Sequence, residues 1–331
     1  MLKFLDITVI IQGSVYPEIT NQTIASVRKF FPDTKIIFST CNPEYTNILE
    51  NYDEMIISDD PGSFTYADRP GEKENNINRQ IISTLAGLKA CKTKYAMKLR
   101  SDFILTGNDF LQFWDEFLNF DRTYQIFEHK LLACTYFARN PSSDMPFPFH
   151  PSDLAFFGYT KDLIKLFDIP LMTKEEAYWN LSDRHQYQYV PEQYLFINCL
   201  RKNGFIADCN FYNDCKPEGI IQTERYFASN FIFLNFEEFN LLHSKNTFSM
   251  KVHPNAFRSC YTHIEWQHLY KKYVDASLNI PLIDDERLKI EKYYKNYKKY
   301  RFLSNLCALP FRNKGTRRQI RNAVLEYFLK N

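Results

Sequence analysis

The stretch Tyr-Ala-Met-Lys-Leu-Arg-Ser-Asp-Phe-Ile-Leu, residues 95–105, decides the expected fold. Its two ends supply the apolar bulk of a buried strand. Its middle holds polar residues where a core strand normally has none: Lys98, Arg100, Ser101 and Asp102. A carboxylate at the carboxyl end of a sheet strand lies where open α/β folds bind their ligands. The stretch therefore predicts a central strand that ends at a ligand site.

Asp102 has two interpretations. Beside the basic Arg100, its carboxylate stays ionised and can hold a hard divalent cation on the phosphates of a ligand. The alternative is an ion pair between Arg100 and Asp102 that only closes the strand. The surrounding sequence favours the first interpretation.

Strands and helices alternate through the first hundred residues. Short apolar runs predict strands over residues 7–11, 35–39 and 54–58, and apolar residues at helical spacing predict helices over residues 20–31 and 75–90. Short connections between such elements are typical of a doubly wound sheet with a ligand crevice. We therefore expect an α/β fold of the Rossmann-like kind, with a mostly parallel central sheet flanked by helices.

The sequence lacks the common phosphate-binding loops, because neither G-x-G-x-x-G nor G-x-x-x-x-G-K-[ST] occurs. Instead, Gln12 and Gly13 end the first expected strand, and the third leads into an acidic turn with Asp59 and Asp60. A nucleotide would then be held by strand ends and a metal ion instead of a glycine loop.

A second polar group follows the central strand. His150, Ser152 and Asp153 lie among aromatic residues and prolines, directly before an apolar strand. The other elements expected in this region are a helix over residues 110–117, a strand over residues 130–136 and a helix over residues 160–167.

Residues 190–204 predict another helix, with Pro191 in its first turn and Gly204 as its stop. Glu192 then lies at the helix N-terminus, where the backbone dipole favours its ionised form. The alternative is that Glu192 is a favourable first-turn acid without a functional role.

Several short motifs occur in one order along the chain: Ile11-Gln-Gly13, Phe30-Phe-Pro-Asp33, Asn78-Arg-Gln80, Lys98-Leu-Arg-Ser-Asp102, His150-Pro-Ser-Asp153, Phe156-Phe-Gly158 and Pro191-Glu-Gln-Tyr-Leu195. With these motifs, residues 7–204 resemble the WavE family of lipopolysaccharide-synthesis proteins. That family resembles, more distantly, the glycosyltransferases of the GT-A fold. The C-terminal third shows no comparable resemblance.

The resemblance implies a donor site. GT-A enzymes hold a divalent metal ion, Mn²⁺ or Mg²⁺, through an Asp-x-Asp element at the end of a central strand. Here Arg100 stands where the first Asp would be, and Asp102 remains as the metal ligand. Arg100 can itself neutralise a phosphate, because a guanidinium fork suits phosphate oxygens. The candidate donor-binding residues are Gln12, Gly13, Asp59, Asp60, Arg79, Arg100 and Asp102.

The resemblance also implies a catalytic base. Glu192 and Gln193 resemble the Glu-Asp helix start that carries the base of inverting transferases, with Gln193 in place of the Asp. Glu192 is the expected base and Asp153 its competitor. In an inverting transfer, one carboxylate takes the proton of the acceptor hydroxyl while the diphosphate leaves. His150 and Ser152 are the candidate acceptor-binding residues.

Bulk composition restricts the protein class only broadly. The 331 residues are 45% apolar, enough for a sizeable core, and the net charge of +2 gives no argument for a nucleic-acid partner. The eight cysteines form no Cys-x-x-Cys pair, which favours reduced thiols. No apolar run approaches the roughly 20 residues of a membrane helix, and Asp6 and Gln12 interrupt the first apolar segment. We expect a cytoplasmic location.

The C-terminal segment is strongly basic. Tyrosines are interleaved with its cations, and Ile320, Val324 and Phe328 make an apolar stripe beside a basic helix face. Such a helix fits an anionic membrane surface, here the inner face of the cytoplasmic membrane. The alternatives are a helix that packs its stripe on the main domain, and RNA binding, for which no recognition motif is present. The basic residues of this segment after Lys289 are Lys292, Lys295, Lys298, Lys299, Arg301, Arg312, Lys314, Arg317, Arg318, Arg321 and Lys330.

These observations predict a GT-A-like domain over residues 1–275 and a basic helical extension over residues 276–331. The expected activity is transfer of a sugar from a nucleotide-sugar donor to a glycan or lipid-linked acceptor of lipopolysaccharide or capsule. The alternatives are a sugar-phosphate or nucleotidyl transferase that uses the same crevice, and a non-catalytic subunit that binds nucleotide sugar or docks a glycan assembly at the membrane.

Overall fold

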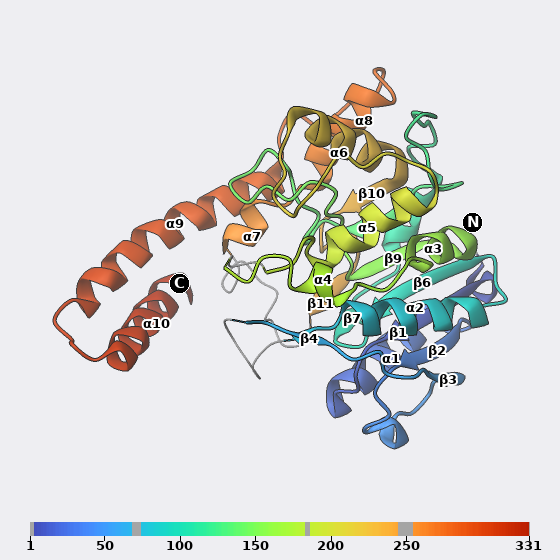
Figure 1. Ribbon diagram of the computed structural model, residues 1–331, viewed down its shortest axis with the longest axis horizontal. Helices are drawn as coiled ribbons and strands as arrows, with labels where there is room; N and C mark the ends of the chain where they lie inside the picture. Colours follow the sequence, from blue (N-terminus) through green and yellow to red (C-terminus); the bar gives the residue numbers. More distant parts are fainter. Residues whose placement is uncertain (1–2, 68–73, 183–185, 244–253, 331) are drawn as a thin grey trace.

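The computed structural model of the protein describes residues 3–67, 74–182, 186–243 and 254–330, except for the side chains of residues 326, 329 and 330. At its centre is a sheet that contains β1 (Ile7–Gln12), β2 (Lys35–Thr40), β3 (Glu54–Ile57), β6 (Tyr95–Arg100), β8 (Leu131–Cys134), β9 (Ala155–Tyr159) and β10 (Phe231–Leu234). The strand order across the sheet is β10-β8-β9-β6-β1-β2-β3 (Figure 1).

Most neighbouring strands run parallel. β1 pairs in parallel with β2 and β6, β2 with β3, and β8 with β10, whereas β9 runs antiparallel to both β6 and β8. The predicted α/β class with a mostly parallel central sheet is therefore confirmed. Two small antiparallel pairs join it: β4 (Phe64–Thr65) with β5 (Glu74–Asn75), and β7 (Phe103–Leu105) with β11 (Leu241–His243).

Helices flank this sheet. The helices are α1 (Pro17–Phe30), α2 (Ile77–Ala90), α3 (Thr160–Phe167), α4 (Lys174–Ala177), α5 (Pro191–Lys202), α6 (Pro217–Asn230), α7 (Pro254–Arg258), α8 (His263–Tyr273), α9 (Asp285–Ala308) and α10 (Lys314–Lys330). α2, α3 and α5 lie side by side across one face of the sheet (Figure 1), and α2 contacts α3, which contacts α5. Short 3₁₀ helices cover Phe4–Asp6, Thr46–Ile48 and Asp109–Asp115.

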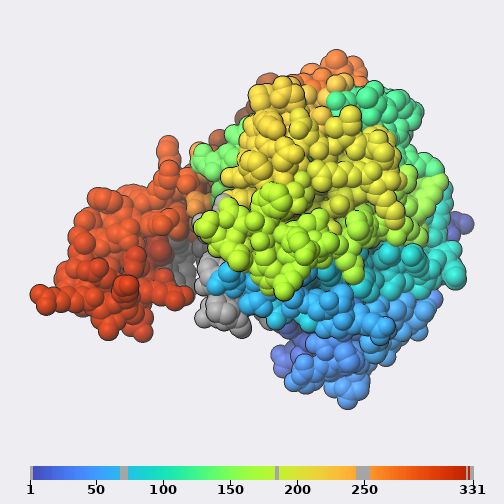
Figure 2. All heavy atoms as spheres, viewed as in Figure 1, coloured from blue at the N-terminus to red at the C-terminus, as the bar shows by residue number. Residues whose placement is uncertain are grey.

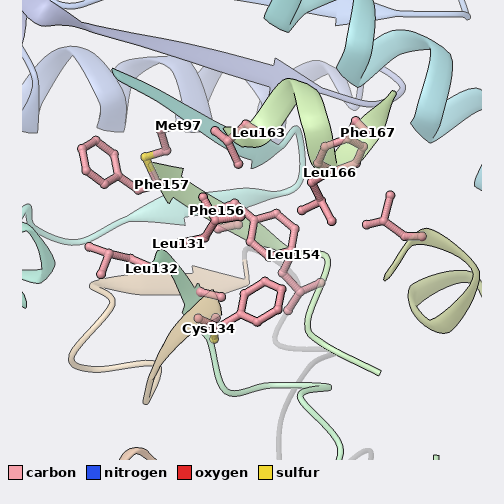
Figure 3. Close-up of a cluster of buried hydrophobic side chains, with 14 of the residues drawn as sticks. Met97, Leu131, Leu132, Cys134, Leu154, Phe156, Phe157, Leu163, Leu166 and Phe167 are labelled. Carbon is pink, nitrogen blue, oxygen red and sulfur yellow. The ribbon is translucent and has the colours of Figure 1, made fainter. Parts of the chain in front are cut away.

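The core lies where the middle of the sheet meets α3. Successive residues of a strand point to opposite faces, so Phe156 and Phe157 of β9 fill both sides of the sheet. Figure 3 shows them with Leu163 and Leu166 of α3, and all four side chains are buried. Because such strands are covered on both faces, they read in the sequence as continuous apolar runs.

Two expected helices differ from prediction. The first begins at Pro17 instead of residue 20, because Pro17 occupies the first helical position, which proline favours. The segment expected as a helix over residues 110–117 is a 3₁₀ helix, Asp109–Asp115, held by bonds such as Leu111 N–H to Asn108 O at 3.1 Å. Phe117 has a φ of 53°, so the chain leaves the helical path there.

α9 and α10 form a helical hairpin, called the C-terminal hairpin below. α9 runs away from the sheet and α10 returns along it (Figure 1), and Figure 2 shows the hairpin as a lobe beside the body. This confirms the predicted helical C-terminal region. The boundary at residue 275 stays a prediction; α8 ends at Tyr273 and α9 begins at Asp285.

The apolar stripe of α10 faces α9. The rings of Phe328 and Tyr300 stack with centroids 4.7 Å apart, and Ile320 and Val324, on the same face of α10, are half-buried. The stripe therefore packs in part on α9, while Phe328 stays 41% exposed. No helix in the described ranges has the length and apolar character to span a membrane.

Candidate functional site

A cavity of about 690 Å³ opens at the carboxyl ends of β1 and β6. After β1, the chain adds β2 and β3 on one side of that strand and then crosses to add β6 on its other side. The direction in which strands are added therefore reverses between β1 and β6. Gln12 and Arg100, the last residues of β1 and β6, are register partners there. Open α/β sheets bind ligands at such a reversal, because the loops diverge from it and leave a crevice.

Most of the residues predicted from the sequence meet in this cavity. Asp59, His150 and Ser152 are not among the residues that line it. Those that line it are Gln12, Gly13, Asp60, Arg79, Arg100, Asp102, Asp153 and Glu192.

Gly13 brings the end of β1 against the turn after β6. Its φ is +137°, and a Cβ at this position would lie 2.6 Å from Ser101 Oγ. Ser101 is buried and fixed by its own contacts: its N–H donates to Gln12 O at 2.9 Å, and its hydroxyl donates to Ser14 O at 2.7 Å. A side chain at Gly13 would therefore push apart the two strand ends that form the cavity floor.

Arg100 and Asp102 form a two-fold ion pair on the cavity wall. Arg100 Nε donates to Asp102 Oδ1 at 3.0 Å, and Arg100 Nη2 donates to Oδ2 at 2.9 Å. His243 of β11 approaches the same carboxylate, with Nε2 3.4 Å from Oδ2. Burial acts to raise the pKa of Asp102, but the charge of Arg100 and the bonds from His243 and Arg100 outweigh it and lower that pKa. The ion pair of the second interpretation is present and lines the cavity, and the divalent cation of the first stays a prediction.

The residues around Asp102 can be compared with the needs of a divalent cation. In the described part of the chain, no three His, Cys, Asp or Glu side chains are grouped to hold a metal ion. Mg²⁺ and Mn²⁺ at nucleotide sites, however, take one or two carboxylates and complete their shell with phosphate oxygens and water. Asp102 supplies a carboxylate of the kind that arrangement uses, at the cavity wall, although Arg100 and His243 already contact its two oxygens.

Arg79, in the first turn of α2, is tied to the acidic turn after β3. Its Nε and Nη2 donate to the two carboxylate oxygens of Asp60, both at 2.7 Å, and its Nη1 donates to Asn76 and Glu74 at 2.7 and 3.2 Å. The hydrogen bonds from Arg79 lower the pKa of Asp60. Arg79 therefore holds Asp60 at the edge of the cavity. Asp60 lines the cavity, and Asp59 does not.

Glu192 is the second residue of α5 and faces the cavity beside Asp153. Burial raises the pKa of Glu192 to about 8, and the charge of Asp153 adds to this. The helix N-terminus was expected to favour the ionised form, but desolvation and the neighbouring carboxylate outweigh it. Asp153 is held in place, because Gln80 Nε2 donates to its Oδ2 at 2.8 Å.

His150 and Ser152, predicted to bind the acceptor, lie beneath the cavity. Ser152 is wholly buried, and its hydroxyl oxygen accepts the Leu154 N–H at 3.4 Å. The His150 ring is 3% exposed, and its Nε2 lies 3.4 Å from Glu192 Oε2. Burial lowers the pKa of His150 to about 3, so the ring is neutral beside Glu192. Neither residue lines the cavity, and His150 reaches it only through its contact with Glu192, so their acceptor-binding role stays a prediction.

Gln193 is turned away from the cavity. Its side chain is wholly buried, and its Nε2 donates to Pro148 O at 2.6 Å and to Tyr212 O at 2.9 Å. These bonds join the start of α5 to the two loops that pack beneath it. Of the two residues at this helix start, Glu192 alone lines the cavity.

Lys98 is a site residue whose role the sequence did not indicate. Its side chain is wholly buried on β6, and its Nζ donates to the backbone oxygen of Asp153. Burial lowers the pKa of Lys98 to about 8, while the charge of Asp153 opposes this effect. Lys98 thus lies under the carboxylate pair and fixes the loop that carries Asp153. Its position inside a core strand was the only available signal.

The cavity wall carries more acids than bases. Its acidic residues are Asp60, Glu74, Asp102, Asp153 and Glu192, and its basic residues are Arg79 and Arg100. Both guanidinium groups are already paired with carboxylates. An anionic ligand would therefore have to arrive with a cation or compete for these guanidinium groups.

Comparison with known proteins identifies a family for the chain. No curated protein matches the chain. The sequence does match a protein family described as WavE lipopolysaccharide synthesis, over residues 7–304. The match includes every cavity residue and extends a hundred residues beyond the motifs quoted above, through most of α9. The chain therefore belongs to the WavE lipopolysaccharide synthesis family.

Proposed function

We propose that the protein is a glycosyltransferase that moves a sugar from a nucleotide-sugar donor to a glycan acceptor of lipopolysaccharide or capsule. One observation carries the proposal. The Arg100–Asp102 pair at the end of β6 and Glu192 at the start of α5 line the same cavity at the reversal point of the sheet. In the proposal, the ion pair would meet the diphosphate and Glu192 would act as the base within the same cavity.

Glu192 is the proposed base. A general base works best when its pKa lies near the working pH, and the pKa of Glu192 is about 8. In its ionised form it would take the proton of the acceptor hydroxyl as that oxygen attacks the sugar carbon. The bond between that carbon and the diphosphate breaks at the same time, and the anomeric configuration inverts. Asp153 is the second candidate for the same role.

Arg100 is the proposed partner of the leaving diphosphate. Its guanidinium lies at the cavity wall and can present N–H groups to phosphate oxygens while it stays against Asp102. A divalent cation that enters with the donor would take Asp102 as its protein ligand and would supply further positive charge against the diphosphate. Gln80 and Lys98 hold Asp153 in position.

A donor panel tests the proposal. The full-length protein is incubated with nucleotide sugars and a short glycan acceptor, with and without Mn²⁺ or Mg²⁺, and the released nucleotide is identified. Nucleoside diphosphate supports glycosyl transfer. Nucleoside monophosphate or pyrophosphate would instead show the sugar-phosphate or nucleotidyl transferase. A thermal-shift screen of the same donors reports binding alone, since a ligand that binds only the folded state raises its stability.

One observation favours the non-catalytic alternative. Both oxygens of Asp102 and most donors of Arg79 are already used within the protein. A subunit that binds nucleotide sugar without turnover would shift its melting temperature with a donor and would release no nucleotide with any acceptor.

The proposed location is the inner face of the cytoplasmic membrane. Residues 292–331 contain eleven Lys and Arg residues and a single acid, Glu326. An anionic leaflet attracts such a segment, and lipid-linked acceptors are presented at that surface. Binding to vesicles at low and high ionic strength tests this location.

A further inference from the structure

The C-terminal hairpin contains a second cavity, separate from the candidate active site. It has a volume of about 350 Å³ and lies between α9 and α10. Three arginines line it, one from α9 and two from α10, together with residues that carry amide and hydroxyl groups. Its lining residues are Arg301, Ser304, Asn305, Arg318, Arg321, Asn322 and Leu325, and we call it the arginine cleft.

The arginines of the cleft differ in their ion-pair partners from the arginines at the base of the hairpin. Near the body, Arg258 pairs with Glu291 and Asp144, and Arg287 pairs with Glu265. Within the described residues, by contrast, no carboxylate forms an ion pair with Arg301, Arg318 or Arg321. Convergent cations without a carboxylate repel one another, so an anion in the cleft would relieve this repulsion.

Apolar side chains are exposed beside the cleft, where α9 turns into α10. Leu306, Leu309 and Phe311 are 45%, 64% and 41% exposed. Along the chain, these three residues lie between Arg301 and Arg318, each within a few helical turns of a cleft arginine. Exposed apolar groups next to convergent cations match the surface of an anionic bilayer, where phosphates lie directly above the acyl chains.

We propose that the arginine cleft binds the phosphate of an anionic lipid headgroup while Leu306, Leu309 and Phe311 enter the bilayer interface. This proposal deepens the membrane location given above and is independent of the transfer chemistry. It names the turn between α9 and α10 as the membrane-facing apolar surface, in place of the stripe of Ile320, Val324 and Phe328, because Phe328 stacks on Tyr300 of α9. Guanidinium groups suit this ligand because they donate paired hydrogen bonds to phosphate oxygens.

Vesicle flotation of the full-length protein tests the cleft. The vesicles contain phosphatidylcholine alone or with about a third phosphatidylglycerol. The cleft variant combines Arg301→Gln, Arg318→Gln and Arg321→Gln. A matched control combines Lys292→Gln, Lys295→Gln and Lys298→Gln, which removes three exposed charges of α9 nearer the body. Lys295 is about 16 Å along the helix from Leu306, beyond the Debye length of about 8 Å at physiological salt.

We expect the wild-type protein to float only with phosphatidylglycerol. The cleft variant should lose roughly 100-fold in partitioning, and the control variant less than about tenfold. Leu309→Ser with Phe311→Ser should also weaken flotation, and this second variant keeps every charge. Equal losses in the cleft and control variants would overturn the proposal, because they would show diffuse attraction only. Equal flotation with pure phosphatidylcholine would overturn it as well.

Two further arms separate the lipid from other partners. Titration with glycerol phosphate tests a soluble phosphate; cleft-dependent binding of that compound without flotation would contradict a lipid site. Single-stranded RNA and the protein's own oligomeric state are measured with the same variants. Cleft-dependent RNA binding without flotation, or a dimer that Leu309→Ser with Phe311→Ser dissociates, would likewise contradict it. None of these readouts needs transferase activity. The lipid-binding proposal can therefore be contradicted while the proposed transferase function holds, and the transferase function can be contradicted while lipid binding holds.

Discussion

Arg100 holds Asp102 through two hydrogen bonds, from Nε to Oδ1 at 3.0 Å and from Nη2 to Oδ2 at 2.9 Å. The two residues are separated by one position in the sequence, at the point where β6 ends. Because the pair lines the cavity, the same contact that closes the strand also presents a carboxylate and a guanidinium to a ligand.

Asp102→Asn should reduce transfer by at least ~10²-fold, because the carboxylate that anchors Arg100 and would ligate a cation is lost. The amide keeps one acceptor for Arg100, so the far-ultraviolet circular dichroism spectrum should not change. Asp59→Asn is the matched control, since Asp59 does not line the cavity. Near-normal turnover of Asp102→Asn would show that the Asp102 carboxylate is not required for the reaction.

Glu192→Gln should lower turnover by ~10²–10⁴-fold and leave donor affinity nearly unchanged, which is the effect of removing a general base. In the wild-type protein, kcat/KM should rise with pH up to about 8, since Glu192 acts only when ionised and its pKa is about 8. Steady-state kinetics between pH 5.5 and 9 checks both points. If Asp153→Asn shows this loss and Glu192→Gln stays active, Asp153 is the base.

Glu192 should also make the free energy of unfolding depend on pH. Burial raises its pKa from 4.5 to about 8, so the folded state binds this proton more tightly than the unfolded state. The stabilisation is therefore complete below about pH 4.5 and decreases as pH rises toward 8, by at most about 1.4 kcal/mol per pH unit. Glu192→Gln cannot ionise, so urea unfolding at several pH values should show a shallower decrease. Equal slopes for both proteins would show that Glu192 has an ordinary pKa.

Arg79→Lys should weaken nucleotide-sugar binding by about tenfold or more, because a lysine cannot donate the paired bonds that hold Asp60 at the cavity edge. Isothermal titration with the best donor measures the change. Arg28→Lys serves as the control, since Arg28 pairs with Asp53 outside the cavity. Unchanged affinity in Arg79→Lys would reduce Arg79 to a packing residue.

Gln193→Ala should destabilise the fold by about 1–3 kcal/mol, since it removes the two hydrogen bonds that the wholly buried Gln193 side chain donates to Pro148 O and Tyr212 O. Turnover per folded molecule should change little, as Gln193 does not line the cavity. Urea unfolding measures the loss, with Gln188→Ala as a control whose single bond is exposed. A selective loss of kcat with full stability would give Gln193 a direct role in the reaction.

The local sequence determined which elements form. Mostly apolar runs predict β1 and β6, because a strand covered on both faces buries nearly all of its side chains. Pro191 and Gly204 bound α5, since proline fits the first helical position and Gly204 adopts a φ of +79° after its end. A carboxylate directly after a buried strand likewise marked Asp102 as a site residue. These features depend on neighbours in the sequence, so the sequence alone could predict them.

Only the tertiary structure decided which distant residues meet. His243 reaches Asp102 because β11 pairs with β7, and no local pattern encodes that pairing. Glu192 shows the same limit: its place at a helix start favours ionisation, but burial beside Asp153 raises its pKa to about 8. The antiparallel direction of β9 follows in the same way from packing across the sheet. Desolvation and charge depend on every group nearby in space, and for these residues most such groups are distant along the chain.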